Sequence, residues 1–276
     1  MTLPVAAPDR KTATVSLPLA IHETLRAVNF RGKGRLLNLL CPRSGVKRSQ
    51  IFGNSMELDL SDLIQRQIYQ GTFEPRETVS VKRYLRPGMT FVDVGANVGY
   101  YTALAAKFVA GRGGRVVAFE PSPYAFTRLK QLVESNQLDH VTAVNLGLSD
   151  TTGVTNIYLG VGSANHSPTM VAHAGSNATE VRIGTLDAEA ERLGLERIDL
   201  LKIDVEGHEP KVLAGAKRLL EGRKIRAVLC EFNEIWLRQV GFSARELERI
   251  FQEAGFVEHG HGNAPRGFDN RFFTLA

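Results

Sequence analysis

A carboxylate and two glycines near the middle of the chain have the residue types and spacing of a ligand-binding turn. Asp93 lies at the end of the apolar segment Thr90–Val94, and the sequence Gly95-Ala96-Asn97-Val98-Gly99 follows it. Glycine adopts backbone conformations that a Cβ forbids, and it lets the backbone approach a ligand closely. A carboxylate at the end of a buried strand is costly unless a positive or hydrogen-bonding group meets it. The ammonium group of S-adenosylmethionine (SAM) would meet Asp93 in this way.

A second carboxylate, Glu120, lies at the end of the next apolar segment, Val116–Phe119. In doubly wound α/β sheets, an acid about 20 residues after the glycine turn hydrogen-bonds the hydroxyls of a ribose. The sequence therefore predicts ribose binding by Glu120. The alternative is a cap for the following helix, because Ser122 and Pro123 are typical of a helix start.

A nicotinamide dinucleotide site also combines a glycine turn with a later acid, and the spacing distinguishes the two kinds of site. The pattern Gly95-x-Asn97-x-Gly99 is not GxGxxG, and an acid two residues before the first glycine is not part of the dinucleotide fingerprint. The sequence therefore favours SAM, and an NAD-binding oxidoreductase is kept as an alternative.

Three further side chains that could move a proton lie within five positions of one another. Asp204, Glu206 and His208 follow the predicted strand Ile198–Ile203. Carboxylates and histidine are usual groups for general-base catalysis, and the strand places them beside the same crevice as the glycine turn. The alternative is structural: Glu206 and Glu209 would favour the N-terminus of the next helix, and His208 would be a solvated loop residue.

Glu231 and Asn233 follow the next predicted strand, Ala227–Cys230. Together with Asp204 they would offer the oxygen ligands that Mg²⁺ prefers. The alternatives are hydrogen bonding to a substrate and a local helix cap. We do not favour a metal site, and Mg²⁺ is kept only as a minor alternative at these three residues.

The elements that would position these residues alternate between strand and helix from residue 89 onward. The predicted strands are Thr90–Val94, Arg115–Phe119, Val141–Leu146, Asn156–Leu159, Glu180–Ile183, Ile198–Ile203, Ala227–Cys230, Phe256–Glu258 and Arg271–Leu275. The predicted helices are Gly99–Val109, Tyr124–Asn136, Leu186–Leu193, Pro210–Leu220 and Ala244–Ala254. Such alternation indicates βαβ units and a parallel sheet. The last two strands are joined by a short link without helical spacing, so they must pair antiparallel.

The region before residue 89 is interpreted as an extension to this sheet. Residues 1–17 are expected to be a loose tail, and residues 19–40 have helical apolar spacing. A hairpin is predicted over residues 46–60, with its turn at Gly53-Asn54. Ser61 or Asp62 begins a predicted helix that runs to about Tyr69, and Thr78–Leu85 is a second short helix.

The composition is that of a globular protein, but the positive charge is concentrated near the N-terminus. The chain has 276 residues, of which 43% are hydrophobic and 23% charged, and its net charge is +5. Residues 1–50 hold nine lysines and arginines against two acids, whereas the rest of the chain holds slightly more acids than bases. This basic arm could contact a membrane surface, RNA or another polyanion. The alternative is a solvated amphipathic helix.

The cysteines and the apolar segments indicate the compartment. Cys41 and Cys230 fit neither a disulfide framework nor the spacing of a zinc site, so a reducing, cytoplasmic compartment is expected. No apolar segment reaches the length of about 18 residues that a membrane span needs. The N-terminus lacks the continuous apolar region of a secretory signal. Neither a membrane span nor a secretory signal is therefore expected.

Taken together, these motifs resemble the FkbM family of methyltransferases. The resemblance extends from about Met56 to Glu234 and is carried by Gly71–Pro75, Phe91–Gly99, Phe119–Pro121, Thr185–Asp187 and Lys202–Glu209. It implies an α/β fold with a Rossmann-like class I methyltransferase sheet, mostly parallel with a C-terminal antiparallel hairpin, after an N-terminal helical and hairpin extension. With the basic arm at residues 1–50 outside the resemblance, the predicted SAM-dependent methyltransferase domain covers residues 51–276. The domain would have lid elements at 56–86 and a core at 89–276.

The resemblance also implies a cofactor site and a reaction. The implied SAM-binding residues are Asp93, Gly95, Asn97 and Gly99 at the methionine part, Glu120 at the ribose, and Ser149 or Asp150 near the adenine. Glu74 would belong to the lid over the cofactor. The implied reaction is methyl transfer to a hydroxyl of a sugar, a glycolipid or a polyketide-type natural product.

An alcohol needs help in losing its proton, and an oriented histidine or carboxylate can supply that help. The candidate bases are His208, Asp204, Glu206 and Glu74. The loop Val161–Gly175, with His166, Met170 and His173, would shape the acceptor pocket. Two other functions are kept as alternatives: a methyltransferase that acts on RNA or protein, supported only by the basic arm, and a SAM-binding module without catalysis.

Overall fold

The computed structural model describes residue 37 and residues 41–159, 177–259 and 268–276. The chain divides into two compact units, Met1–Lys47 with Leu58–Phe73, and Arg48–Glu57 with Glu74–Ala276. The predicted tail at 1–17, nearly all of the predicted helix at 19–40 and the predicted acceptor loop Val161–Gly175 lie outside the described residues.

The predicted hairpin is present, with its turn one residue earlier than expected. β1 (Val46–Ile51) and β2 (Asn54–Asp59) form a two-stranded sheet. The turn residues are Phe52 and Gly53, with φ angles of 55° and 92°. Positive φ at both central residues is the type I′ geometry, whose twist matches that of the flanking strands.

The two predicted helices of this region are also present. α3 (Leu63–Gln70) begins after Asp62, whose side chain accepts a hydrogen bond of 2.7 Å from the backbone N–H of Gln65. α4 (Pro75–Tyr84) begins three residues before the predicted start. Pro75 explains the early start, because proline is favoured at the first helical position.

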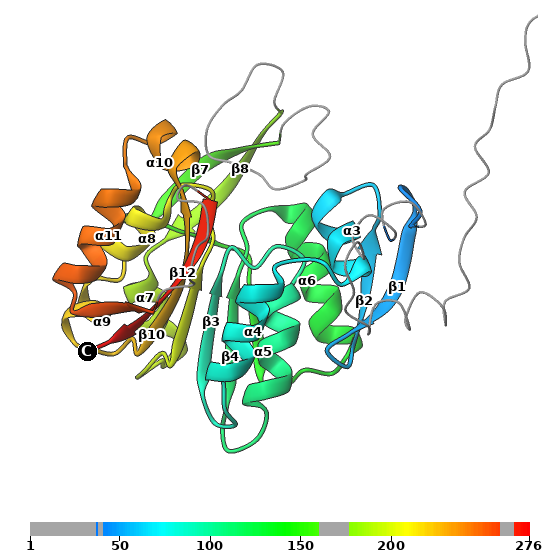
Figure 1. Cartoon of the computed structure of the whole chain (residues 1–276), viewed down its shortest axis with the longest axis horizontal. Coiled ribbons are helices and arrows are strands. Elements are labelled where there is room, and N and C mark those ends of the chain that lie inside the picture. Colours follow the sequence, from blue (N-terminus) through cyan, green and yellow to red (C-terminus); the bar gives the residue numbers. More distant parts are fainter. Residues whose placement is uncertain (1–36, 38–40, 160–176, 260–267) are drawn as a thin grey trace, which may run out of the picture. The chain divides into compact units, whose positions relative to one another are not determined.

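A seven-stranded sheet forms the centre of the second unit, in the order β11-β12-β10-β9-β3-β4-β5 (Figure 1). The strands are β3 (Thr90–Val94), β4 (Arg115–Phe119), β5 (Val141–Val144), β9 (Leu200–Ile203), β10 (Ala227–Asn233), β11 (Phe256–His259) and β12 (Phe268–Leu275). The five strands from β5 to β10 in this order are parallel, and β12 is antiparallel to both β10 and β11. The predicted parallel sheet and its antiparallel hairpin are confirmed.

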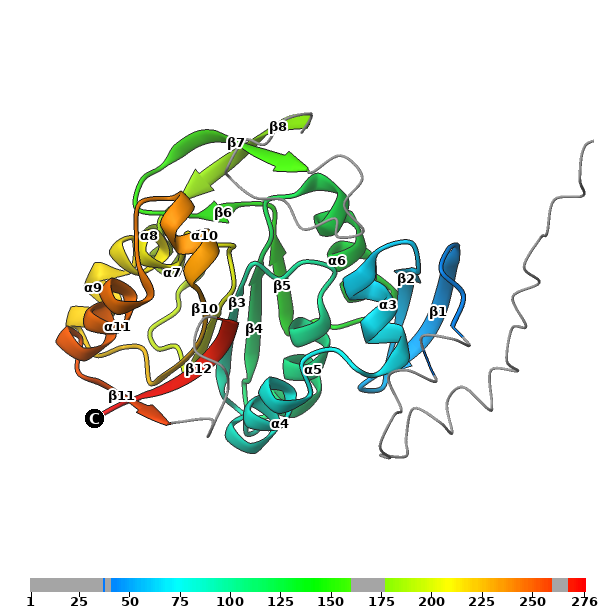
Figure 2. The same ribbon diagram turned by 45° about the horizontal axis from the view of Figure 1, so that its top comes forward.

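Helices cover both faces of this sheet (Figures 1 and 2). One face is covered by α4, α5 (Tyr100–Val109) and α6 (Pro123–Ser135). The other is covered by α7 (Leu186–Leu193), α8 (Glu209–Ala214), α9 (Lys217–Glu221), α10 (Glu234–Gln239) and α11 (Ala244–Glu253). In the part of the chain that the structure describes, no helix is both long and apolar enough to cross a membrane.

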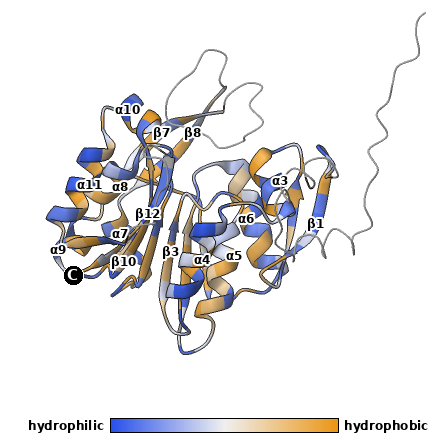
Figure 3. Ribbon diagram, viewed as in Figure 1, coloured by the Kyte–Doolittle hydropathy of each residue, from blue (hydrophilic) through white to orange (hydrophobic). Residues whose placement is uncertain are grey.

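The larger apolar core lies between the sheet and the second group of helices. Val92 of β3, Leu201 of β9 and Val228 of β10 are fully buried in it. The rings of Phe251 on α11 and Phe273 on β12 stack there with centroids 4.1 Å apart. Apolar colour predominates along β3 and β10 in Figure 3, whereas α4 and α11 carry hydrophilic residues. Apolar burial on this face therefore holds the parallel strands in register.

A smaller sheet follows β5. β6 (Gly147–Leu148), β7 (Gly153–Leu159) and β8 (Asn177–Gly184) pair in the order β6-β8-β7, with β7 antiparallel to β8. The strands predicted at 156–159 and 180–183 are confirmed, and both are longer than predicted. The predicted strand at 141–146 ends at residue 144.

The single helix predicted at Pro210–Leu220 was wrong, because two short helices, α8 and α9, occupy this segment. A Cβ on Gly215 would lie 2.0 Å from the carbonyl oxygen of Ser149, so the chain approaches that backbone at the break. The carboxylate of Asp187 then accepts hydrogen bonds of 2.8 and 3.0 Å from the N–H groups of Arg218 and Leu219, and caps α9.

The predicted end of the strand at Cys230 was also wrong. β10 continues to Asn233, so Glu231 lies within the strand. The unpredicted helix α10 follows immediately, with Asn233 as its N-cap.

Candidate active site

The carboxyl ends of the adjacent parallel strands β4, β3, β9 and β10 bring most of the predicted site residues to one edge of the sheet. Asp93 of β3 lies beside Lys202 of β9 in the strand register. Both side chains point to the face covered by α4 and α5, since their strand neighbours Val92 and Leu201 belong to the core on the opposite face.

Asp93 is 1% exposed, and its Oδ2 accepts a hydrogen bond of 2.7 Å from the hydroxyl of Thr102 on α5. Its Oδ1 is buried and has no hydrogen-bond partner in the described part of the chain. Burial raises the pKa of Asp93, and the positive charge of Lys202 opposes that shift. A buried carboxylate oxygen without a donor is suited to an ammonium group, the role predicted for Asp93.

The glycines of the turn have packing roles as well as the predicted role of ligand approach. Gly95 has a φ of 78°, and a Cβ on it would lie 1.9 Å from the backbone oxygen of Asp204. Gly99 has a φ of 93°, and a Cβ on it would lie 2.6 Å from a methyl carbon of Leu132 on α6. Glycine is therefore required here to bring β9 and α6 close to the turn.

Glu120 fastens the turn to the start of α6. Its carboxylate accepts two hydrogen bonds of 2.8 Å, from the N–H of Asn97 and from the N–H of Ser122. Asn97 has a φ of 50°, a conformation that asparagine tolerates better than most residues. Burial, which leaves Glu120 4% exposed, raises its pKa to about 7. Each carboxylate oxygen has a second acceptor site, so the predicted ribose contact is compatible with the bond to Ser122.

The residues predicted near the adenine follow β6. Ser149 is buried, and its hydroxyl donates a hydrogen bond of 3.0 Å to Asp150, which is exposed. The N–H of Ser149 donates to the carbonyl of Gly184 at the end of β8. The small sheet therefore holds this pair in place, and adenine binding stays a prediction.

A network around Lys202 joins two of the predicted bases. The Nζ of Lys202 donates a hydrogen bond of 2.8 Å to Oδ2 of Asp204 and lies 4.8 Å from the ring centroid of Tyr101. The hydroxyl of Tyr101 in turn donates a hydrogen bond of 2.6 Å to Oε2 of Glu74. Burial raises the pKa of Glu74 to about 7, against the lowering effect of the Lys202 charge. Glu74 has a φ of 37°, which is strained for a non-glycine residue.

Glu206 lies in the tight turn after β9. It has a φ of 53° and Gly207 has a φ of 97°, and a Cβ on Gly207 would lie 2.6 Å from the backbone of Trp236. Glu209 holds this turn, since its Oε1 accepts hydrogen bonds from the N–H groups of Val205 and Gly207. Burial and the charges of Asp204 and Glu209 raise the pKa of Glu206 to about 8.

His208 has different neighbours from the other predicted bases. It is 5% exposed, and its Nδ1 has no hydrogen-bond partner among the described residues. Burial and the charge of Lys211 lower its pKa to about 4, while Asp150 opposes the shift. The alternative of a solvated loop residue is wrong, because His208 is buried. Its charged environment is that of the residues predicted near the adenine, not that of Glu74 and Lys202.

Comparison with known proteins identifies the family. Residues 93–258 match the model of the methyltransferase FkbM domain, which is more than half of the chain. The chain belongs to the FkbM methyltransferase family. The match begins later and ends later than the resemblance at Met56–Glu234 that the motifs indicated, and it extends into β11.

Three curated relatives illustrate the family. The chain is 30% identical to the methyltransferase sdnD of Sordaria araneosa, over 45% of this chain and 59% of the relative. It is 30% identical to the 31-O-demethyl-FK506 methyltransferase FkbM of Streptomyces tacrolimicus, over 55% of this chain and 68% of the relative. It is 27% identical to the 2-O-methyltransferase NoeI of Sinorhizobium fredii, over 61% of this chain and 75% of the relative. The chain thus matches between 59% and 75% of the length of these relatives.

Two of the three residues considered for a metal have an oxygen that the protein itself engages. The Oδ1 of Asn233 accepts the N–H groups of Ile235 and Trp236, as the cap of α10. The Oδ2 of Asp204 is paired with Lys202. Within the described ranges, no group of three or more His, Cys, Asp or Glu side chains is arranged to hold a metal ion. A metal site at Asp204, Glu231 and Asn233 stays a minor alternative, and we derive no step through it.

Three residues that contact the predicted site residues were not themselves predicted as site residues: Thr102, Tyr101 and Lys202. The signal for Lys202 was present, because it is the polar residue of an otherwise apolar strand, Leu200–Ile203. Thr102 and Tyr101 gave no signal, since their roles depend on α5 lying against β3 and β9.

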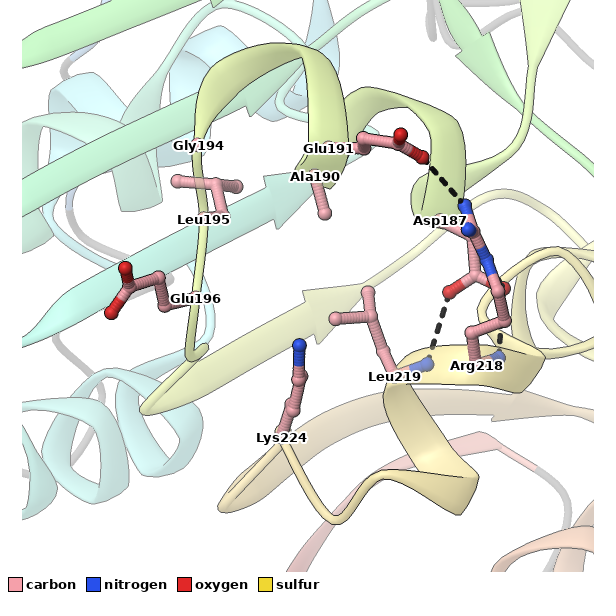
Figure 4. Close-up of a pocket in the computed structure, with 9 residues that line it drawn as sticks. All are labelled: Asp187, Ala190, Glu191, Gly194, Leu195, Glu196, Arg218, Leu219 and Lys224. Carbon is pink, nitrogen blue, oxygen red and sulfur yellow. Dashed lines mark hydrogen bonds and ion pairs between the residues drawn. The ribbon is translucent and has the colours of Figure 1, made fainter.

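A hollow of about 350 Å³ lies elsewhere, between α7 and α9 (Figure 4). Ala190 and Leu219 contribute apolar side chains, and Arg218 pairs with Glu191 at 3.1 Å. Lys224 lies just before β10, so this hollow is near the amino ends of the strands. It is thus at the opposite end of the sheet from the predicted site residues.

Proposed function

We propose that this chain is a SAM-dependent O-methyltransferase that methylates a hydroxyl of a sugar, a glycolipid or a natural product. The observation that carries the cofactor assignment is Asp93, a buried carboxylate with one oxygen left without a donor beside the glycine turn. Glu120 on the adjacent strand supports it with a second buried carboxylate. The FkbM and NoeI relatives, which are named as O-methyltransferases of a hydroxyl, support the hydroxyl acceptor.

When bound, SAM supplies an electrophilic methyl group on a sulfonium. Asp93 would accept a hydrogen bond from the ammonium group through Oδ1, while Thr102 keeps the carboxylate oriented through Oδ2. Glu120 would accept the ribose hydroxyls. Because both carboxylates are fixed by protein donors, little side-chain ordering is needed when the ligand binds.

We propose Glu74 as the base that takes the proton of the acceptor hydroxyl. A base must be deprotonated and still basic near neutral pH, and the Glu74 pKa of about 7 meets both conditions. Burial and the charges of Asp204 and Glu209 raise the pKa of Glu206 further, to about 8. His208, with a pKa of about 4, is a weak base. Asp204 is paired with Lys202, which gives it a supporting role.

The test combines binding and transfer. Calorimetry should detect SAM binding and no NAD binding, and Asp93→Asn should weaken SAM binding. Labelled SAM should then transfer methyl to members of a panel of glycans, glycolipids and hydroxylated metabolites, with RNA and protein as further arms. NAD binding without SAM binding would contradict the proposal. SAM binding with transfer only to RNA or protein would assign one of the alternative functions, and binding without transfer to any arm would favour a non-catalytic module.

A further inference from the structure

Lys202 is a buried lysine at the centre of the sheet, and its burial calls for an explanation. Its side chain is 3% exposed, and its strand neighbours Leu201 and Ile203 are apolar and fully buried. Replacing a buried ion pair with apolar residues of similar volume is often neutral or stabilising. Packing of β9 therefore gives no reason for a lysine at this position.

The contacts of Lys202 point toward the proposed base. Its ammonium group binds the carboxylate of Asp204 directly, at 2.8 Å, and lies against the ring of Tyr101. The same tyrosine donates its hydroxyl to Glu74. Lys202 thus contacts Asp204 directly by a charge-assisted hydrogen bond. It contacts Glu74 indirectly, through a cation–π contact with the tyrosine that donates to Glu74.

The elements around Lys202 present mainly acids to it. The titratable groups that interact with Lys202 are Asp93 on β3, Glu74 at the start of α4, Tyr101 on α5, Asp204 and Glu206 after β9, and Cys230 and Glu231 on β10. The Asp204 charge raises the pKa of Glu74, Asp93, Glu206 and Glu231, and the Lys202 charge lowers the pKa of the same four carboxyls. Lys202 therefore offsets the effect of Asp204 on its neighbours.

We propose that Lys202 is a positioning residue for proton removal, which fixes Asp204 with its ammonium group and keeps the Glu74–Tyr101 pair charged and in place. The inference rests on the proposed function. In the step concerned, the acceptor O–H bond breaks and its proton passes to a Glu74 carboxylate oxygen. The electron pair of that bond forms the O–CH₃ bond as the C–S bond of the sulfonium breaks, and its electrons remain on sulfur.

Two substitutions separate the charge of Lys202 from its hydrogen bond. Lys202→Met removes both and keeps a similar chain length, whereas Lys202→Gln removes the charge and keeps a donor for Asp204. Lys217→Met is the control, because Lys217 is exposed on α9 and, among the described residues, its one ion pair is with Glu221 of the same helix. Thermal unfolding confirms that each variant is folded.

The first readout needs no substrate or cofactor. The Glu74 carboxyl of the free protein is titrated by ¹³C NMR, and Glu74→Gln assigns its signal. We expect the Glu74 pKa to rise by about 1 unit or more in Lys202→Met and Lys202→Gln, since an adjacent opposite charge is removed. It should stay unchanged in Lys217→Met. An unchanged Glu74 pKa in both Lys202 variants would overturn the inference.

The second readout is the pH dependence of methyl transfer. The acidic limb of kcat/KM should move to higher pH by the same amount in both Lys202 variants. A fall in thermal stability with no movement of this limb would assign Lys202 a structural role and overturn the inference. If Lys202→Gln titrates like the unaltered protein, the hydrogen bond and not the charge is what matters, and the inference fails in its present form. Absence of transfer by the unaltered protein would count against the proposed function, while the NMR titration would still decide the role of Lys202.

Discussion

The two faces of the central sheet are built from alternate residues of the same strands, yet they differ sharply in chemistry. Toward α7, α8 and α11, β3 and β9 present residues such as Val92 and Leu201, which are fully buried in an apolar cluster. Toward α4 and α5, the same strands present Asp93 and Lys202, which are just as buried. The apolar residues of the first face stabilise the fold. Burying the charged residues of the second face costs free energy, and we attribute their presence to function.

The largest effect expected from breaking this comparison is at Glu74. Glu74→Gln removes the proposed base and keeps an acceptor for Tyr101, so kcat should fall by roughly 10²–10⁴-fold. The acidic limb of the pH–rate profile near the Glu74 pKa of about 7 should disappear with it. The measurement is single-turnover transfer of labelled methyl across pH 5.5–9.

His208→Gln is the matched comparison for that experiment. Because the pKa of His208 is about 4, its substitution should leave the limb near pH 7 in place. If His208→Gln abolishes the limb and Glu74→Gln does not, the two assignments must be exchanged.

The second effect contrasts adjacent residues on the two faces. Asp93→Asn should weaken SAM binding by roughly 10–100-fold, because a hydrogen bond to a charged group contributes about 1.5–3 kcal/mol. Val92→Ala should leave SAM affinity almost unchanged and lower the free energy of unfolding by about 2 kcal/mol. Calorimetry and urea unfolding of both variants make the comparison. Equal losses of affinity would mean that the two faces are not functionally distinct.

The third effect is a pH dependence of stability. The pKa values of Glu120 and Glu209 are about 7 and that of Glu206 about 8, all raised by burial above the usual value for a carboxyl. The folded state then binds more protons than the unfolded state, so its stability falls as pH rises toward and through these values. His208 has the opposite effect, because burial lowers its pKa to about 4, so its contribution makes stability rise with pH. That rise ends at about pH 6.5, the usual pKa of histidine.

The free protein should therefore unfold at a lower temperature at pH 8 than at pH 6.5. Glu120→Gln should reduce this difference in melting temperature, because it removes one of the titrating carboxyls. Each such carboxyl contributes about 1–3 kcal/mol to the pH dependence of the free energy of unfolding. A melting temperature that is independent of pH in this window would show that these carboxyls are ionised in the folded state.

The smallest effect concerns a polar residue of β10 that we assign to structure. Asn233→Ala removes the cap of α10 and should lower the free energy of unfolding by about 1 kcal/mol. Methyl transfer, with or without EDTA, should change little. A strong dependence on EDTA would reinstate the metal alternative at Asp204, Glu231 and Asn233.

Much of the fold could be predicted because its signals are local. β3, β4 and α7 have the predicted bounds, since a short apolar run or a capped amphipathic segment marks each of them. The break between α8 and α9 could not be predicted, because it depends on the approach of Gly215 to Ser149, which lies far away in the sequence. The end of β10 was predicted too early for a local reason. Glu231 and Asn233 are polar and suggest that the strand has ended, although the residues between and before them, Phe232 and Cys230, lie in the core on its other face.

The site was predictable in its carboxylates and not in their partners. Acids at the ends of apolar strands are conspicuous in a sequence, so Asp93 and Glu120 could be named as candidates, and both are buried. Tyr101 and Lys202 contact the predicted residues because α5, β9 and α4 come together, and no spacing along the chain encodes that arrangement. The predicted bases could not be ranked without the structure, because the pKa values of Glu74, Glu206 and His208 depend on burial and on neighbouring charges.

The register of β3 has a consequence for the order of folding. Asp93 lies beside Lys202, which comes 109 positions later in the chain. During synthesis, β3, β4 and β5 emerge well before β9, and their pairing depends on contacts of much shorter sequence separation. Asp93 therefore has no cationic neighbour from β9 until that strand docks. Until then, the early half-sheet exposes a strand edge that bears an unpaired acid, a charge of the kind that discourages pairing with other chains.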